Sequence, residues 1–502
     1  MKPSGKRLGP LIDLSVLSLL MAFVYTSSAV AQAPGTFIPV GNMTTPRIFH
    51  TATLLLNGKV LIAGGDDFNN RQLASAELFD PMTNTFTPTG DMTTGRSGHS
   101  ANLLPDGRVL IVGGQYHDQP SAELYDPSTG TFTTTAVFLP SGFGYQSTSL
   151  NNGKVLLSGD GIGCPNGNDG CFIINTPELY DPATGTVTVT GDYADKTFNP
   201  VTGYLGLILA PAVLLPDGRV LIAAEPAAEL YDPATATFRL TDRRTSVTYG
   251  GGGTATLLTS GKVLLAGGDL FDAGWSADAE LYDPSTEKFT AIQKMNRIRS
   301  RHTATLLRDG TVLIAGGDHT CTFTNSGGVD VLSCDAADTG TEIYDPPTGT
   351  FNAGPKMTSY RVSHTATLLM DGRILIAGGG TDMRGFWPTN SAELYTPSVL
   401  VPAQIVTDLR FDRTNAVTGS SYSLNISGSN LTPETFFDIR FIGPDTDSDV
   451  ALNWQKGPAA RHDVPGGTAS GVWAINGVRA HQIETDHTGD FVPISATITV
   501  SP

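Results

Sequence analysis

The chain has 502 residues, of which 57 are glycine and 32 are proline, and only 16% are charged. This length is too great for one hydrophobic core, so two or more domains are expected, and the composition is typical of a turn-rich β protein. The formal net charge of −17 argues against nucleic acid and against an anionic membrane surface as partners.

The first 31 residues have the pattern of a secretory signal peptide. Three cations among the first seven residues precede the apolar run 14–24, and the small residues 29–31 form a cleavage site. We therefore predict cleavage after Ala31, a secreted or periplasmic location, and no membrane attachment of the mature chain. An uncleaved membrane anchor is the alternative.

Residues 47–86 are predicted to form a four-stranded antiparallel unit. Two apolar strands, 51–56 and 59–63, are joined by Asn57-Gly58, a dipeptide that favours a tight hairpin turn. The double glycine Gly64-Gly65 ends the second strand, and the third strand, 76–79, runs into an Asp-Pro turn. A fourth short strand follows this turn.

The same unit recurs along most of the chain. Its third strand and turn, Glu-x-aromatic-Asp-Pro, begin at Glu77, Glu123, Glu178, Glu229, Glu280, Glu342 and Glu393, the last copy having Thr396 in place of Asp. From Asp80 to Thr396 there are 316 residues over six steps, a mean period of about 53. Seven copies of four strands at such a period predict a β-propeller.

These motifs resemble the kelch repeat, which has a double glycine, a Glu-x-Tyr-Asp-Pro strand and an aromatic residue after a tight turn. The resemblance covers roughly residues 35–400. It implies an all-β fold with a seven-bladed kelch-type β-propeller over residues 32–400. Residues 35–42 match a fourth strand that lacks its first three, so we expect them to complete the last blade and close the ring.

The repeat stops near residue 400. Residues 401–502 alternate as six or seven strands separated by glycine and proline clusters, which predicts a C-terminal immunoglobulin-like β-sandwich. The order of signal peptide, kelch propeller and β-sandwich resembles the galactose oxidase family of secreted proteins.

Arg-x-x-His opens four of the repeats, at Arg47/His50, Arg96/His99, Arg299/His302 and Arg361/His364. One interpretation is structural, because a group repeated in four blades would bond each blade to its neighbour. The other places the arginines at the mouth of the central channel, beside Asp66, Asp269 and Asp318, which follow double glycines. Such a rim would suit polar, hydroxyl-rich or anionic ligands.

The inserted segments join the second strand to the third, or the fourth strand to the next blade. Because the strands are antiparallel, these segments all lie on one face, which we call the long-loop face. Variable loops on a rigid scaffold carry function, so we expect a ligand site there. Trp275, Phe386 and Trp387 lie in such loops, and we expect Phe68 and Tyr116 beside them on the same face. These rings would stack on a sugar, or else cover the loops' own small core.

The four cysteines form two close pairs, Cys164 with Cys171 and Cys321 with Cys334, each within an insertion. In an exported protein this predicts two local disulfides; the alternative, a metal site, has only His319 nearby. The loop 160–169 is rich in glycine and oxygen ligands and would suit calcium, although it lacks EF-hand spacing.

The galactose oxidase resemblance implies a copper radical site built from two histidines, two tyrosines and a cysteine linked to one tyrosine. The sequence departs from this set, since every cysteine is placed for a disulfide and the four repeated histidines belong to blade starts. His481 and His487 lie in the C-terminal domain, where that family has one ligand, without visible partners. We predict no metal and no cofactor, with copper and calcium as the alternatives.

The sequence contains no nucleophile elbow, phosphate-binding loop or zinc-protease helix, so no catalytic residue is assigned. We expect a secreted non-catalytic protein whose long-loop face binds a carbohydrate or an extracellular protein. The alternatives are a galactose oxidase-like copper radical oxidase or another carbohydrate-active enzyme, and a structural or adhesion module.

Overall fold

A computed structural model describes most of the chain. The described residues are 35–114, 121–137, 146–158, 161–163, 172–174, 177–194, 210–224, 226–245, 251–270, 274–317, 321–326, 329–334, 339–381, 387–398, 405–413, 415–417, 421–429, 436–442, 449–454, 459–463, 471–481 and 496–501. The predicted signal peptide lies outside them.

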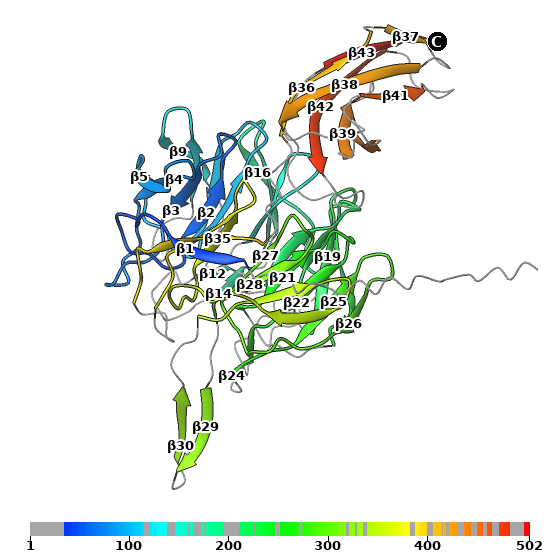
Figure 1. Cartoon of the computed structure of the whole chain (residues 1–502). Helices are drawn as coiled ribbons and strands as arrows, with labels where there is room; N and C mark the ends of the chain where they lie inside the picture. Colours follow the sequence, from blue (N-terminus) through cyan, green and yellow to red (C-terminus); the bar gives the residue numbers. More distant parts are fainter. Residues whose placement is uncertain are drawn as a thin grey trace, which may run out of the picture. The chain divides into compact units, whose positions relative to one another are not determined.

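Seven four-stranded antiparallel sheets form the blades of a propeller (Figure 1). Blade 1 has β2 (Thr51–Leu54), β3 (Val60–Ala63), β4 (Ala76–Asp80) and β5 (Thr85–Pro88); blade 2 has β6 (Ser100–Leu103), β7 (Val109–Val112), β8 (Ser121–Asp126) and β9 (Thr131–Val137). Blade 3 has β10 (Gln146–Ser149), β11 (Val155–Ser158), β15 (Glu178–Asp181) and β16 (Thr186–Val189); blade 4 has β17 (Ala212–Leu214), β18 (Val220–Ile222), β19 (Ala227–Asp232) and β20 (Thr237–Arg243).

The remaining blades follow the same plan. Blade 5 has β21 (Thr254–Leu257), β22 (Val263–Ala266), β25 (Ala279–Asp283) and β26 (Lys288–Ala291); blade 6 has β27 (Thr303–Leu306), β28 (Val312–Ala315), β31 (Glu342–Asp345) and β32 (Thr350–Ala353). Blade 7 has β33 (Thr365–Leu368), β34 (Ile374–Ala377), β35 (Ala392–Thr396) and β1 (Thr36–Pro39). Insertions add the hairpins β12 (Gly161–Gly163) with β14 (Phe172–Ile174), β23 (Asp269–Leu270) with β24 (Gly274–Trp275), and β29 (Cys321–Ser326) with β30 (Val329–Cys334).

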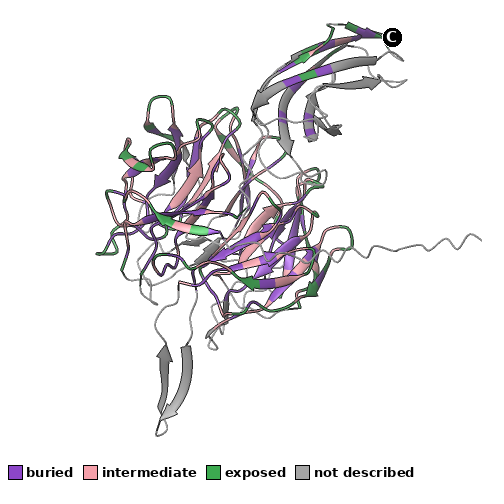
Figure 2. Ribbon diagram, in the orientation of Figure 1, coloured by how far each residue is buried: buried purple, intermediate pink, exposed green. Residues whose placement is uncertain are grey.

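The core of the propeller lies between blades rather than within one blade. The second strand of a blade, such as β3 or β7, is buried along its whole length (Figure 2). Leu61 and Ala63 of blade 1 pack in one cluster with Val109 and Tyr125 of blade 2. A continuous apolar run without alternation is what a strand buried on both faces requires, and this explains the Val-Leu-Ile-Ala pattern of the repeat.

The N-terminal strand β1 is the fourth strand of blade 7. It pairs antiparallel with β35, from Thr36 opposite Thr396 to Pro39 opposite Glu393. Beyond the strand, Val40 N donates to Ala392 O at 3.0 Å and Met43 N donates to Asn390 O at 2.8 Å. The two ends of the propeller sequence therefore share one sheet, which leaves no open edge between the first and last blades.

The repeated arginines are interior residues that bind glutamates of their own blades. Arg47, Arg96, Arg299 and Arg361 are fully buried. Their guanidinium groups lie 3.0, 2.9, 3.0 and 3.0 Å from Glu77, Glu123, Glu342 and Glu393. The expectation that they line the channel mouth and contact a ligand is therefore wrong, because each side chain points inward to a carboxylate 27 to 43 residues downstream.

The repeated histidines join neighbouring blades. Each Nε2 bonds a threonine of the preceding blade: His50 with Thr365 at 3.0 Å, His99 with Thr51 at 2.9 Å, His302 with Thr254 at 3.1 Å, and His364 with Thr303 at 3.0 Å. The first glycine of four double glycines makes room for the histidine of the next blade; a Cβ on Gly64, for example, would lie 2.7 Å from the His99 ring. Arg-x-x-His and Gly-Gly thus form one inter-blade lock.

Glu178 is a repeat glutamate without an arginine partner among the described residues. Glu178 in blade 3 is only 5% exposed, its Oε2 has no hydrogen-bond partner, and it forms no ion pair within the described part of the chain. The strand pairing aligns Gln146 with Thr51, so Gly142 has the sequence position that Arg47 has in blade 1. Burial raises the pKa of Glu178 from 4.5 to about 7.

This glutamate should make the propeller less stable as the pH rises from about 4.5 to 7. The unfolded chain loses the Glu178 proton near pH 4.5, whereas the folded chain keeps it until about pH 7. We therefore expect the free energy of unfolding of Glu178→Gln, relative to the parent, to rise by roughly 3 kcal/mol across this interval and then to level off.

Urea titrations at several pH values measure this difference. Asp242→Asn, which changes an exposed carboxyl group, is the control and should show no comparable trend. If the difference in the free energy of unfolding between the parent and Glu178→Gln did not change with pH, Glu178 would be solvated or paired in solution.

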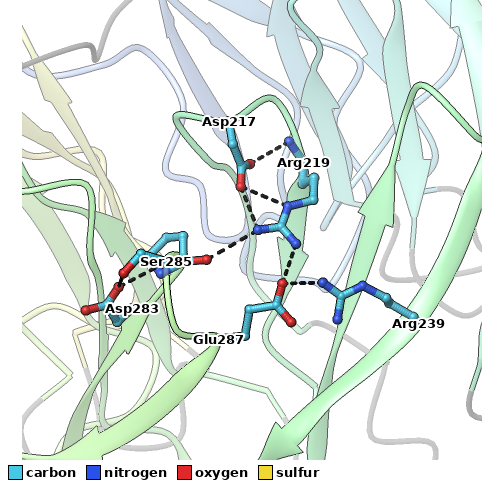
Figure 3. Close-up of polar contacts among 7 residues, drawn as sticks. Asp217, Arg219, Arg239, Asp283, Ser285 and Glu287 are labelled. Atoms are coloured by element: carbon cyan, nitrogen blue, oxygen red, sulfur yellow. Dashed lines mark hydrogen bonds and ion pairs between the residues drawn. The ribbon is translucent and has the colours of Figure 1, made fainter.

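A surface ion network joins blades 4 and 5 on the hairpin side of the propeller (Figure 3). Arg219 lies 2.6 Å from Asp217 in its own hairpin and 2.6 Å from Glu287 in the next blade, and Arg239 also contacts Glu287. These two arginines lower the pKa of Glu287 to about 2. The network bridges a seam that lacks a histidine lock, because blade 5 does not begin with Arg-x-x-His.

The C-terminal part contains two further sheets. One has the order β36 (Ile405–Phe411), β38 (Ser421–Ser429) and β41 (Ala459–Asp463). The other has the order β37 (Asn415–Val417), β43 (Ala496–Ser501), β42 (Gly471–His481), β39 (Phe436–Ile442) and β40 (Asp449–Trp454). An immunoglobulin-like sandwich remains a prediction for this part. None of the described segments is a helix long and apolar enough to cross a membrane.

Candidate functional site

Backbone hydrogen bonds link the beginnings of the innermost strands of five consecutive blades, 5, 6, 7, 1 and 2, along part of the circle around the propeller axis. The residues that make these bonds each precede the histidine position of their blade. They are Gly252, Arg301, Ser363, Phe49 and Gly98. Arg301 N donates to Gly252 O at 2.7 Å, Ser363 N to Arg301 O at 2.9 Å, Phe49 N to Ser363 O at 3.4 Å, and Gly98 N to Phe49 O at 2.9 Å. We call these five residues the axial ring.

The axial ring is strained. Phe49, Arg301 and Ser363 have φ values of 56°, 55° and 49°, in the left-handed region that costs a non-glycine residue roughly 1–2 kcal/mol. Strain of this kind persists only where the surrounding structure enforces it, and it clusters at functional sites. Here the inter-blade hydrogen bonds enforce it, and they hold three side chains at the centre of the long-loop face.

Two of these side chains meet across an intervening blade. The Arg301 guanidinium carbon, from blade 6, lies 6.0 Å from the centroid of the Phe49 ring, from blade 1. Blade 7 separates these two blades, so the contact is possible only close to the axis. Ser363 of blade 7 lies between them in the ring, and its buried hydroxyl has no hydrogen-bond partner. We call this place the axial mouth.

A carboxyl group borders the axial mouth. Asp66 pairs through its backbone with Ile48, the residue before Phe49, and its Oδ2 accepts a hydrogen bond of 2.7 Å from Ser97, the residue before Gly98. The other oxygen, Oδ1, is buried without a partner. Burial raises the pKa of Asp66, helped by the charge of Asp67 and opposed by the Ser97 hydrogen bond. A raised pKa in a buried carboxyl group is one of the marks of a candidate for proton transfer.

Exposed aromatic rings lie on the same face. Phe68 and Trp387, in the loops of blades 1 and 7, are 52% and 61% exposed, and their ring centroids are 6.3 Å apart. Trp275 is only partly exposed. Its backbone lies opposite Asp269 in the β23–β24 hairpin. The structure thus brings Trp387 together with Phe68 and places Trp275 in a different blade.

Several predicted residues are not placed in detail. Asp318, Phe386, Cys164, Cys171 and most of the loop 160–169 lie outside the described residues. Cys321 and Cys334 stand opposite each other in the β29–β30 hairpin, and their disulfide remains a prediction.

Comparison with known proteins agrees with this architecture. The Kelch motif family matches residues 49–93. Among solved structures, a fungal alcohol oxidase of the AA5 family in complex with copper matches 93% of this chain and 100% of its own, with a TM-score of 0.61 and 17% sequence identity. This chain is a β-propeller that contains a Kelch motif, and its architecture is similar to that of this AA5 oxidase. No curated protein sequence matches the kelch-repeat chain.

This match corrects the functional expectation. A solved structure that matches 93% of this chain is an alcohol oxidase, so the enzyme alternative is better supported than a non-catalytic binding protein. At 17% identity the likeness itself concerns the fold, and the chemistry must be judged from the residues of this chain.

The described residues do not supply a copper radical site. The Nε2 atoms of the four blade-start histidines are occupied by threonines of neighbouring blades. Within the described part of the chain, no three His, Cys, Asp or Glu side chains are gathered as a metal site requires. A set of two histidines and two tyrosines would need residues from outside this part, where Tyr116, His117, Tyr145 and His319 lie. Tyr116-His117 is a Tyr-His pair in the sequence.

The axial mouth contains functional candidates that sequence reasoning missed. Phe49, Arg301 and Ser363 occupy the variable position of Arg-x-x-His, and nothing in their residue types predicts a positive φ. The sequence did offer a positional clue to these residues. In every blade with Arg-x-x-His, the residue before the histidine lies at the same distance from the propeller axis. Asp66 is the one predicted rim residue whose described side chain lies at the mouth.

Proposed function

We propose that this chain is an extracellular enzyme that acts on an alcohol or a carbohydrate at the axial mouth of its propeller. The observation that carries the proposal is the structural match to an alcohol oxidase over nearly the whole chain. The signal-peptide pattern of the first 31 residues supports an extracellular location.

The residues at the mouth have properties that such a reaction requires. Asp66 combines burial, a raised pKa and a free oxygen, so it is the candidate for moving a proton to or from a substrate hydroxyl. The exposed faces of Phe68 and Trp387 suit stacking with the apolar side of a sugar ring. Because the described residues do not fit copper, no step of the reaction is assigned to a metal.

Turnover assays on the mature protein test this proposal. Oxygen consumption and peroxide release are followed with a panel of alcohols and sugars, before and after copper loading, while the same sugars and their polymers are followed for bond cleavage. We expect turnover that falls by roughly 100-fold or more in Asp66→Asn, with the melting temperature unchanged. Asp106→Asn, in a hairpin on the opposite face, is the matched control and should keep full activity.

The outcomes separate two claims. No turnover on any alcohol or carbohydrate would overturn the proposed function. Turnover that survives Asp66→Asn would keep the enzyme but move its site away from the axial mouth. Copper content by elemental mass spectrometry, measured on the same samples, decides whether residues outside the described part assemble a metal site.

A further inference from the structure

Arg301 is a cation without an ion pair among the described residues of an acidic protein. Eleven other arginines lie within 4.0 Å of a carboxylate, as Arg71 and Arg373 do. Arg301 has no ion pair among the described residues, and its contact is the face of Phe49 at 6.0 Å. The chain has 48 Asp and Glu against 31 Lys and Arg, so an arginine held at the centre of a face without a carboxylate partner calls for an explanation.

The backbone fixes Arg301 in this place. Its N–H and C=O are both used in the axial ring, to Gly252 at 2.7 Å and from Ser363 at 2.9 Å, and its φ of 55° is costly for a residue with a side chain. Glycine would relieve that strain, as at Gly98 in the same ring position of blade 2. A structural role for the ring alone therefore does not require arginine here.

The surroundings of the mouth are positive or neutral. The buried histidines behind the ring are held neutral, because burial first and the nearby arginine charges second lower the pKa values of His302 and His364 to about 3. The carboxyl group that borders the mouth, Asp66, has a pKa raised by burial, and the neighbouring Asp67 carboxylate is paired with Arg71 at 3.0 Å. A bound anion would therefore be attracted by the Arg301 guanidinium, whereas a second cation would be repelled.

The other groups at the mouth suit a hydroxylated ring. Phe49 is 38% exposed and offers a ring face beside the guanidinium group. The Ser363 hydroxyl and the Asp66 Oδ1 are buried without partners, and unsatisfied groups of this kind gain most from a ligand hydroxyl. The combination of one guanidinium, one aromatic face and two unsatisfied oxygens matches a molecule that carries a carboxylate and several hydroxyls.

We infer that the axial mouth binds an acidic sugar, a hydroxylated ring whose carboxylate pairs with Arg301 and whose apolar side lies against Phe49. This inference names a substrate class for the enzyme proposed above. The statement that the bound acidic sugar is a substrate therefore rests on the proposed function. Planar guanidinium groups bind carboxylates through two parallel hydrogen bonds, so the charge of the ligand sets its orientation and its hydroxyls are directed toward Ser363 and Asp66.

Equilibrium binding tests this inference without any turnover. Isothermal titration calorimetry compares trigalacturonate with its methyl ester, which has the same rings but no charge, and with gluconate, a free sugar acid without a ring. We expect the parent to bind trigalacturonate at least 10-fold more tightly than the ester. In Arg301→Gln that preference should fall by about 10-fold to 100-fold, the usual value of a charge-assisted hydrogen bond, and Arg301→Lys should retain part of it.

The controls separate the possible failures. Arg71→Gln, an exposed arginine in a loop of the same face, should leave both affinities unchanged. Tighter binding of gluconate than of trigalacturonate would overturn the acidic-sugar assignment in favour of a free sugar acid. Equal binding of acid and ester by the parent, or a preference that survives Arg301→Gln, would overturn the inference even if the protein proves to be an enzyme. A charge preference with no turnover would leave the inference standing while the proposed function fails.

Discussion

Replacing Arg96 with Met should lower the free energy of unfolding of the propeller by about 3–5 kcal/mol. Arg96 is fully buried and donates to Glu123 at 2.9 and 3.1 Å and to the carbonyl of Gly113 at 2.9 Å. Methionine fills much of the volume but leaves the Glu123 carboxylate buried without a cation. Urea unfolding followed by tryptophan fluorescence and far-ultraviolet circular dichroism measures the loss.

The double variant Arg96→Met with Glu123→Gln is the matched control for this prediction. It removes both charges, so it should recover a large part of the lost stability, because a buried pair is costly to break and much less costly to replace. Thr93 N donates to Glu123 Oε2 at 2.7 Å, and the glutamine oxygen can still accept that bond. If Arg96→Met alone changed the free energy of unfolding by less than about 1 kcal/mol, the buried ion pair would not be what holds the blade.

The locks and the axial ring occupy the same part of the propeller. Blades 5, 6, 7, 1 and 2 supply the ring, and the histidine bonds join these same blades in the same order. A site that must hold side chains in strained conformations benefits from a rigid support. The locked blades therefore explain how the ring keeps Phe49, Arg301 and Ser363 in place.

The fold was predictable because its signals are local and repeated. Asn57-Gly58 and the Asp-Pro turns each fix a chain reversal over a few residues, and seven copies in order exclude most other architectures. The role of Arg47 was not decided by such signals. Its partner, Glu77, is 30 residues away, and only the folded sheet shows that the side chain turns inward to the glutamate rather than outward to the channel.

The candidate site was only partly predictable. Asp66 was found from its place after a double glycine, but its free oxygen depends on the single bond from Ser97 in the next blade. Phe49 and Arg301 carry no local sign of a left-handed backbone, since the hydrogen bonds that impose it come from other blades. Glu178, by contrast, could have been found from the sequence as one of two candidates, because its repeat and that of Glu229 have the glutamate and lack the arginine.

Removing residues 34–43 should destabilise the whole propeller rather than one blade. The deletion removes β1, so the edge of β35 loses its paired strand. It also removes the contact between Phe37 and Tyr395, whose ring centroids are 4.9 Å apart. It also removes Met43, which is buried beside Gly378. Loss of one large buried side chain costs about 2–5 kcal/mol, so with the lost strand we expect a fall in melting temperature of more than about 10 °C.

Differential scanning calorimetry of the shortened protein measures this effect, with a protein that begins at residue 34 as the control. Adding a synthetic peptide of residues 34–43 should raise the melting temperature again in a concentration-dependent way, because a segment that binds only the folded ring stabilises it by mass action. A single cooperative transition that shifts as a whole would show that β1 closes the ring. A shortened protein that melts like the control would mean that blade 7 is stable with three strands, and that the locks between blades, rather than the shared sheet, hold the ring closed.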